Sequence, residues 1–223
     1  MNEIMQALDQ LALLLQARLS AHFSNRDMDP QAYLDDMAEN TSALSTFAPF
    51  SQTEQALLLI ALVPHLQPNF FESVIQQYLP QGGDFAEFGG VKAGNHRGML
   101  PTGETVLFLL AGRQLGKRLQ IQKLFSEDGL LAREAALSLG EVKAGEPMMS
   151  GRLVLTQDWL DKTLLGRELQ PRFSQDFPAR RLQTNMKWED AVLHPITREQ
   201  INDISTGCSF NINLKQMPTL AVK

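Results

Sequence analysis

The sequence predicts a predominantly helical α+β fold, and three observations lead to this prediction. Apolar residues recur at helical spacing through the first part of the chain. Two short apolar segments separated by turn residues follow later and are typical of a β-hairpin. A further helix comes next, with a threonine before it and a glycine after it. We therefore expect a helical lobe over residues 1–80, a mixed lobe of helices and a β-hairpin over residues 81–183, and a third segment over residues 184–223.

The helical lobe is expected to begin with two helices. The first spans residues 2–23, where apolar residues recur in steps of three and four and form one stripe: Ile4, Leu8, Leu11, Leu15 and Leu19. The second follows Asp29, which can cap a helix that has Pro30 at its first position. Three residues supply its inward face: Tyr33, Leu34 and Met37.

Two more helices are expected before residue 80. Ser51 and Glu54 have the spacing of a capping box and stand just before the apolar run "ALLLIALV". Pro64 is expected to end that helix, because proline removes a backbone donor and clashes with the preceding turn. The fourth helix follows Pro68, and five residues form its buried side: Phe70, Phe71, Val74, Ile75 and Tyr78.

The mixed lobe is expected to contain helices on both sides of a hairpin. Pro101 and Thr102 start a helix that carries "VLFLLAG", breaks near Gly112 and resumes in "RQLGKRLQIQKLF". The segments "AALSLGEV" and "SGRLVLTQ" predict two strands joined through "KAGEP". Thr156 then caps the helix "QDWLDKTLL", which Gly166 ends. This order is compatible with a winged-helix module and with other α+β arrangements.

The last part of the chain is expected to be less regular. The stretch "RELQPRFSQDFPARRLQTNMKWEDAVL" has two prolines and little periodicity, which predicts an extended strap packed by Phe173, Phe177 and Trp188. A short helix is expected in "TREQINDIS". The alternating apolar residues of "CSFNINL" are typical of a terminal strand.

Composition and charge argue against a membrane-spanning, secreted or nucleic-acid-binding protein. The longest apolar run, residues 56–63, is far shorter than the roughly 20 residues that cross a bilayer, and the N-terminus carries no evident secretory signal. The single cysteine, Cys208, fits a reducing compartment. The formal charge of −5 disfavours nucleic acid as a partner. We expect a cytoplasmic protein that binds protein partners and does not enter a membrane.

The glycine-rich stretch "GGVKAGNHRG" is the strongest candidate for a binding or structural loop. Its candidate residues are Gly89, Gly90, Lys92, His96, Arg97 and Gly98. The glycines do not match the dinucleotide fingerprint, and they permit positive φ angles and close backbone approach, which favours a compact structural loop. In the alternative, Arg97 binds a carboxylate or phosphate with its planar fork, although Glu87 and Glu104 are available as internal partners.

No catalytic, cofactor-binding or metal residue is assigned from motifs. The nearest approach to a Walker A loop is "GRQLGKR", residues 112–118, which is one residue short and has Arg118 where the hydroxyl belongs. The histidines form no HExxH pair, and no GxSxG turn is present. We expect residues 112–118 to form a helix break with solvated basic side chains.

A family resemblance rests on four segments taken in order. These are "EFGGVKAGNHRGMLPTGETVLFLLAG", "GEPMMSGRLVLTQDWLD", "FPARRLQT" and "WEDAVL", within about residues 60–205. Together they resemble the region that precedes the ATPase module in AAA+ ATPases encoded with phage-tail-like contractile injection systems. In that family a Walker A motif, a Walker B motif and an arginine-bearing core would follow "WEDAVL". This sequence continues instead through "TREQINDIS" to "TGCSFNINLKQMPTLAVK", without a phosphate loop.

The resemblance implies an accessory domain that recruits or orients injection-particle components for a ring ATPase. We expect the chain itself to hydrolyse no ATP, with ATP and Mg²⁺ belonging to the AAA+ module that is missing from this sequence. The resemblance also implies that Trp188, Glu189 and Asp190 form the joint to that module. The alternative is that they only pack within the extended strap, with Trp188 as its anchor. Two other functions stay open: a winged-helix nucleic-acid binder using Arg180 and Arg181, and a small-molecule enzyme using Arg97.

Overall fold

The computed structural model describes residues 2–83, 85–166, 194–203 and 206. The chain divides into two compact units, Met1–Leu169 and Gln170–Lys223. The predominantly helical α+β class is confirmed. The predicted boundary after residue 80 falls inside the first unit, and the one after residue 183 lies outside the described residues. In the second unit residues 195–203 are helical, where "TREQINDIS" predicts a helix.

The first two helices, α1 (Asn2–Phe23) and α2 (Gln31–Thr41), pack against each other. α1 buries the whole predicted apolar stripe, and it also buries Arg18. Asp29 Oδ1 accepts a hydrogen bond of 3.3 Å from the Gln31 N–H, so Asp29 supports the start of α2 as expected. The helix itself begins at Gln31, one residue later than predicted.

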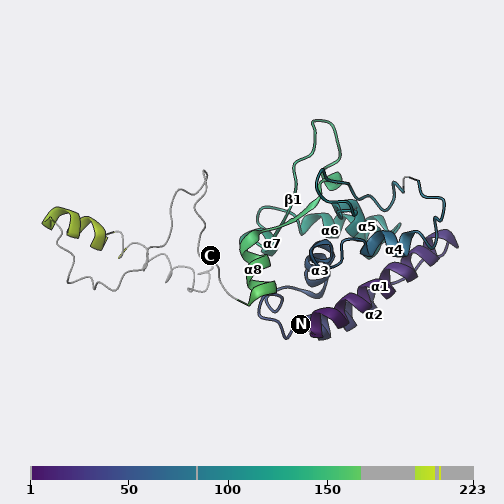
Figure 1. The fold of residues 1–223 in the computed structure, drawn as a ribbon, viewed down its shortest axis with the longest axis horizontal. Helices are drawn as coiled ribbons and strands as arrows, with labels where there is room; N and C mark the ends of the chain where they lie inside the picture. The colour runs from purple at the N-terminus through teal and green to yellow at the C-terminus, as the bar shows by residue number, and fades with distance from the viewer. Residues whose placement is uncertain (1, 84, 167–193, 204–205, 207–223) are drawn as a thin grey trace, which may run out of the picture. The chain divides into compact units, whose positions relative to one another are not determined.

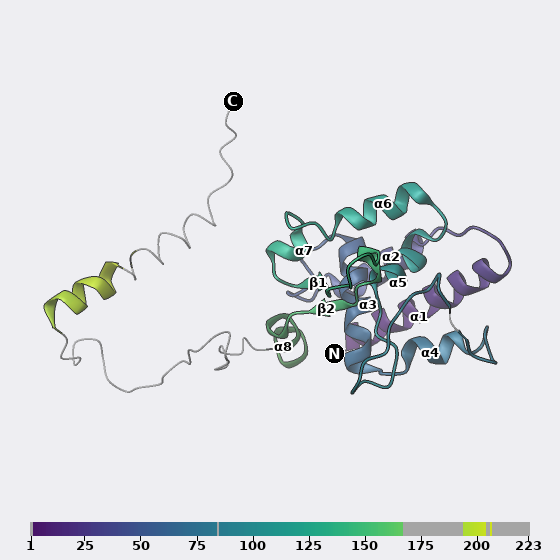
Figure 2. The ribbon, with the colours of Figure 1, turned by 90° about the horizontal axis from the view of Figure 1, so that it is seen from above.

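Helix α3 (Gln52–Leu66) occupies the middle of the first unit, as Figures 1 and 2 show. Every residue from Glu54 to Pro64 is buried, which is expected of a helix surrounded on all sides. The predicted capping box is present. The Ser51 N–H donates to Glu54 Oε2 at 2.9 Å, and the Glu54 N–H donates to Ser51 Oγ at 3.4 Å.

The prediction that Pro64 ends α3 was wrong, because the helix runs on to Leu66. Proline has no backbone N–H, so a helix that contains it lacks the hydrogen bond to the carbonyl four residues earlier. The next turn is still formed, since the Gln67 N–H donates to the Val63 carbonyl at 2.8 Å. Burial of the apolar residues around Pro64 outweighs one missing hydrogen bond. Helix α4 (Phe70–Ile75) follows and buries the predicted phenylalanines.

The second half of the first unit starts with α5 (Gly103–Ala111) and α6 (Leu115–Lys123). Thr102 is the N-cap of α5, as predicted. Gly112, with φ of 55°, separates the two helices, which is the predicted helix break. The sequence did not indicate α7 (Leu130–Arg133), because one turn is too short to show a helical repeat.

The predicted hairpin is present as β1 (Leu137–Leu139) and β2 (Leu153–Leu155). The strands are antiparallel, with Ser138 opposite Val154. Their connection is longer than the predicted turn and contains a 3₁₀ turn, η1 (Met148–Ser150). Helix α8 (Gln157–Leu165) follows. Thr156 Oγ1 accepts from the Trp159 N–H at 3.3 Å, and Gly166 ends α8 in the left-handed conformation, as predicted.

One continuous hydrophobic core joins all of these elements in the first unit. The α8 side chain Trp159 packs edge-on against Phe47 with ring centroids 5.2 Å apart. The Trp159 Nε1–H also donates to the Thr46 carbonyl at 3.3 Å. Residues 1–80 and 81–166 therefore share a core. Among the described residues, no helix has both the length and the apolar character that spanning a membrane requires.

Candidate functional site

The glycine-rich stretch predicted as a candidate loop lies between α4 and α5 and folds back on itself. Val91 and Leu100 form an antiparallel bridge with hydrogen bonds of 2.9 and 2.8 Å. The Gly90 N–H donates to Thr102 Oγ1 at 3.1 Å, at the start of α5. Thr102 in turn forms an isolated antiparallel β-bridge with Arg152, the residue before β2. The stretch therefore ties the start of α5 to the edge of the small sheet.

Three of its glycines have packing reasons to be glycine. Gly89 has φ of 71°, and a Cβ there would lie 2.7 Å from Thr102 Oγ1. Gly90 has φ of 89°, and a Cβ would lie 2.6 Å from Met99 Sδ. A Cβ on Gly98 would lie 1.8 Å from the Pro68 carbonyl oxygen. Positive φ and close backbone approach are the two situations in which glycine is needed.

The polar candidates of this stretch do not line the pocket described below. Lys92 and Arg97 are exposed. His96 is half-buried, and its Nε2 has no hydrogen-bond partner within the described part of the chain. The proposed joint residues Trp188, Glu189 and Asp190 lie outside the described residues, as do Arg180, Arg181 and Cys208.

The pKa of His65, near the end of α3, is shifted in the folded protein, and this predicts a pH effect. His65 is exposed to solvent as a residue, but protein atoms crowd its imidazole, and this partial desolvation, and secondly the charge of His96, lower its pKa below the usual 6.5. A histidine whose pKa is lower in the folded state stabilises the fold above the unfolded pKa, and that contribution is lost as pH falls through the folded pKa. We expect the urea midpoint of the His65→Gln variant to fall less than that of the wild type between about pH 7.5 and 5.

The control for this prediction is His194→Gln, at an exposed histidine of the second unit. It should leave the pH dependence of the urea midpoint unchanged. If His65→Gln and the wild type lose stability in parallel as the pH falls, His65 does not carry the effect.

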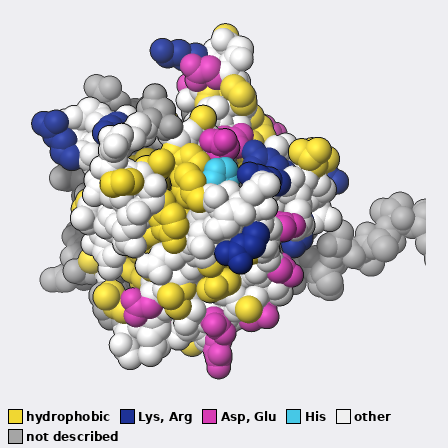
Figure 3. All heavy atoms as spheres, turned by 90° about the vertical axis from the view of Figure 1, so that its right-hand side faces the viewer, with side chains coloured by type: hydrophobic (Ala, Val, Ile, Leu, Met, Phe, Trp, Pro, Cys, Tyr) yellow, Lys and Arg dark blue, Asp and Glu magenta, His cyan; other side chains and the backbone are white. Residues whose placement is uncertain are grey.

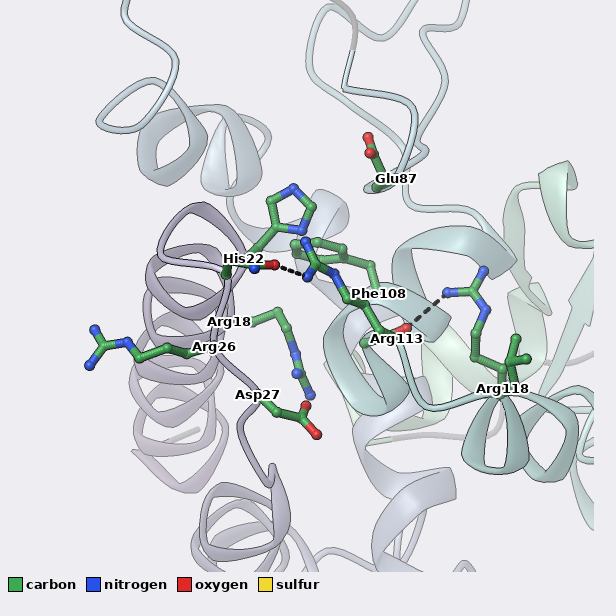
Figure 4. A pocket seen from close by; sticks show the side chains of 11 residues that line it. Arg18, His22, Arg26, Asp27, Glu87, Phe108, Arg113 and Arg118 are labelled. Carbon is green, nitrogen blue, oxygen red and sulfur yellow. Dashed lines mark hydrogen bonds between the residues drawn. The ribbon is translucent and has the colours of Figure 1, made fainter.

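A pocket of about 720 Å³ lies between two corners of the first unit and is shown in Figure 4. One corner is the α1–α2 connection, residues 24–30, and the other is the α5–α6 connection, residues 112–114. We call this space the corner pocket. Its charged lining residues are Arg18, Arg26, Asp27, Glu87, Arg113 and Arg118. Arginines thus outnumber carboxylates around it.

Arg18 is the most deeply buried charge of the corner pocket. It comes from α1, and its side chain reaches toward the α1–α2 corner (Figure 4). Only 4% of the residue is exposed. Nε–H donates to the Leu109 carbonyl at 3.0 Å and Nη1–H to the Met28 carbonyl at 3.4 Å, while Nη2 is buried without a partner among the described residues. Burial lowers the pKa of Arg18, and the charges of Asp27 and Asp29 oppose that shift.

Gly112 makes room for the Arg18 guanidinium. A Cβ at Gly112 would lie 2.6 Å from Arg18 Nη1, and the φ of 55° already disfavours any other residue. The glycine that ends α5 therefore also serves the pocket.

Three polar contacts join the α1–α2 corner to the α5–α6 corner and the first turn of α6, and we call them the corner latch. Arg113 Nη1–H donates to Asn25 Oδ1, and Gln114 Nε2–H donates to Asp27 Oδ2 at 2.9 Å. Lys117 Nζ pairs with Asp29 Oδ1 at 3.2 Å. The hydrogen bond from Gln114 is the main reason that the pKa of Asp27 is lowered. The latch fixes the position of Arg113 without giving it a carboxylate partner.

The rest of the lining is partly aromatic. Phe108 is 4% exposed, and its ring lies 5.4 Å from the ring of His22 and 5.3 Å from that of Phe85. Arg118 is paired with Glu104 at 2.6 Å and also donates to the Gly112 carbonyl at 3.2 Å. Figure 3 shows the side of the first unit at which α1 ends, where hydrophobic side chains lie next to Lys and Arg side chains.

The rim of the corner pocket includes an apolar ridge on α6. Leu115 lines the pocket and is 75% exposed, and Leu119 is 60% exposed. Residues four apart lie on the same face of a helix, so the two leucines are neighbours. We call this pair the α6 ridge. Two neighbouring apolar side chains this exposed form a candidate contact surface for a partner.

The sequence analysis missed Arg18, although a signal was present. Arg18 stands three residues after Leu15 and one before Leu19, inside the apolar stripe of α1. A charged residue at a core position of an amphipathic helix needs a specific reason, since unpaired charges are rarely buried. The charge within the apolar stripe is therefore the sequence signal for this pocket.

The fold and the site define a predominantly helical α+β unit with an arginine-lined pocket between two corners. No group of histidine, cysteine, aspartate and glutamate side chains suited to a metal ion occurs in the described ranges. No protein-family model matches the chain, and neither a curated protein nor a solved structure was found to be similar to it.

Proposed function

We propose that this chain is a non-catalytic protein-interaction domain that serves an AAA+ ATPase of phage-tail-like contractile injection systems. It acts in the cytoplasm, and its partners are the AAA+ module and components of the injection particle. The ordered resemblance of the four sequence segments supports the choice of family. The α6 ridge is the observation that carries the choice of an interaction role.

The α6 ridge has the properties of an anchor for a protein partner. Each leucine that a partner covers contributes up to about 1.5 to 3 kcal/mol by burial of apolar surface. The helix "LGKRLQIQK" has no acidic residue, and two of its three basic residues are paired internally, Lys117 with Asp29 and Arg118 with Glu104. The third, Lys123, stands four residues after Leu119 and so lies on the same face as the ridge. The proposed occupant is therefore a particle component that offers an apolar pocket with an acidic side chain beside it.

The proposal assigns no ATP hydrolysis to this chain, with ATP and Mg²⁺ in the AAA+ module. The segment closest to a Walker loop supports that assignment. Residues from Leu115 onward are helical, and the Arg118 N–H donates to the Gln114 carbonyl at 3.0 Å. A phosphate loop needs its backbone N–H groups free to surround the phosphates.

The proposal is tested by binding to injection particles purified from the source organism. The immobilised chain is expected to retain a particle component, and the double variant Leu115→Ser, Leu119→Ser should bind it at least about tenfold more weakly. Leu13→Ser is the matched control, because Leu13 is 48% exposed on α1 and lies outside the ridge.

Two results would contradict the proposed function. In one, the double variant and the wild type retain the same proteins equally well. In the other, the chain retains no particle component but shifts DNA at low salt, with an affinity that falls steeply as salt is added. The second result would favour the winged-helix alternative.

A further inference from the structure

Arg18 has no direct carboxylate partner within the part of the chain that the structure describes, and the charges of Asp27 and Asp29 only partly offset its burial. Its partners there are two backbone carbonyls, those of Leu109 and Met28. Asp27 is engaged elsewhere: Oδ2 accepts from Gln114, and Oδ1 accepts from the Met28 N–H at 3.0 Å. A buried guanidinium is costly unless an anion accompanies it.

Arg113 is the second arginine of the pocket without a carboxylate partner among the described residues. Its Nη1–H donates to the neutral side-chain oxygen of Asn25. Arg118 differs, because Glu104 neutralises it. Arg26 also forms no ion pair with a described carboxylate, but its side chain extends away from Arg113 and Arg118 (Figure 4). Glu87 lies on the far side of the pocket from Asp27 (Figure 4). The pocket thus has an excess of positive charge at Arg18 and Arg113.

We propose that the corner pocket binds a small organic anion whose carboxylate or phosphate oxygens are held by Arg18 and Arg113. Both oxyanions fit the planar donor fork of arginine. The apolar part of the anion lies against His22 and Phe108, which line the same space. A volume of about 720 Å³ is in the range of small-molecule sites. This inference does not depend on the proposed protein-interaction role.

The pocket is built before the anion arrives. Arg18 is fixed by its bond to Leu109 in the last turn of α5, and Gly112 admits its guanidinium. Arg113 is fixed by the corner latch. Donors that are already in position lose little conformational freedom when the ligand binds, so affinity is retained even for a small molecule.

The test measures binding of simple probes by calorimetry at low salt. Phenyl phosphate and benzoate carry the two oxyanions on the same aromatic body, and benzyl alcohol is their neutral counterpart. We expect at least one anionic probe to bind with Kd below about 1 mM and the alcohol to give no measurable binding. The tighter of the two anions identifies the oxyanion that the pocket selects.

Substitutions place the binding at the pocket. Arg18→Met removes the buried charge at similar length and should weaken the preferred probe by about tenfold or more. Arg133→Met is the matched control, because Arg133 is exposed on α7 and does not line the pocket. It should leave the affinity unchanged.

A second variant decides the question if Arg18→Met does not fold. Asn25→Asp supplies an internal carboxylate at the atom that Arg113 already contacts, and its φ of 51° is one that aspartate tolerates. It should fold and bind the probe about tenfold more weakly. The inference is overturned if no anionic probe binds the folded wild type, or if Asn25→Asp binds as tightly as the wild type.

Discussion

The Phe88→Ala variant is expected to lose about 3 to 5 kcal/mol of the free energy of unfolding. Phe88 is fully buried, and its ring lies 5.7 Å from that of Phe71 and 5.6 Å from that of Phe108. Truncation to alanine removes buried apolar surface and leaves a cavity between α4 and α5 that the surrounding rings cannot fill. Urea unfolding followed by far-UV circular dichroism measures the change.

Phe23→Ala is the control for Phe88→Ala. Phe23 belongs to the same aromatic cluster, with its ring 5.8 Å from those of Tyr78 and Phe85, but 47% of it is exposed. The control should cost no more than about 1 kcal/mol, because exposed side chains contribute less on burial. Equal losses in the two variants would mean that Phe88 is not packed as described.

The Gly98→Ala variant is expected to lose about 2 to 3 kcal/mol of the free energy of unfolding. Gly98 is buried, and the added Cβ would lie 1.8 Å from the Pro68 carbonyl oxygen and 2.9 Å from its carbonyl carbon. Both are backbone atoms, so relief requires the segment between α3 and α4 to move away from the glycine-rich stretch. The same urea titration measures this loss.

Gly94→Ala is a matched control in the same stretch. A Cβ at Gly94 would meet no atom within 4 Å, and Gly94 does not have a positive φ. Its free energy of unfolding should change by no more than about 0.5 kcal/mol. If the Gly98 and Gly94 variants were equally stable, the close approach of Gly98 to Pro68 would be wrong.

The features that sequence predicted well are local ones. Ser51 and Glu54 are three residues apart and satisfy each other's backbone donors, so their spacing alone specifies the start of α3. Thr156 and Gly166 likewise mark the two ends of α8 through contacts within one turn. In each case the side chain and its partner are both visible in a short window of sequence.

The features that sequence predicted poorly depend on distant parts of the chain. Pro64 stays inside α3 because the residues around it are buried by other helices, which no local rule contains. The corner pocket is a stronger case. Arg18 meets the Leu109 carbonyl 91 positions away, and Gly112 is needed because that guanidinium is there.

The glycine-rich stretch stands between these two cases. Its composition identified Gly89, Gly90 and Gly98 as candidates, but a positive φ and a near neighbour could equally have served a ligand or the fold. The contacts to Thr102, Met99 and Pro68 supply a packing reason for each glycine. Lys92 and Arg97 remain exposed candidates for partner contact.

The corner latch also affects the order in which parts of the chain fold. Each of its contacts joins side chains 87 or 88 positions apart. Bringing such distant residues together costs loop-closure entropy, whereas helices such as α1 and α3 nucleate from neighbours. We expect helical signal to return early in a refolding experiment and the oxyanion-binding capacity of the pocket to return only in the last phase.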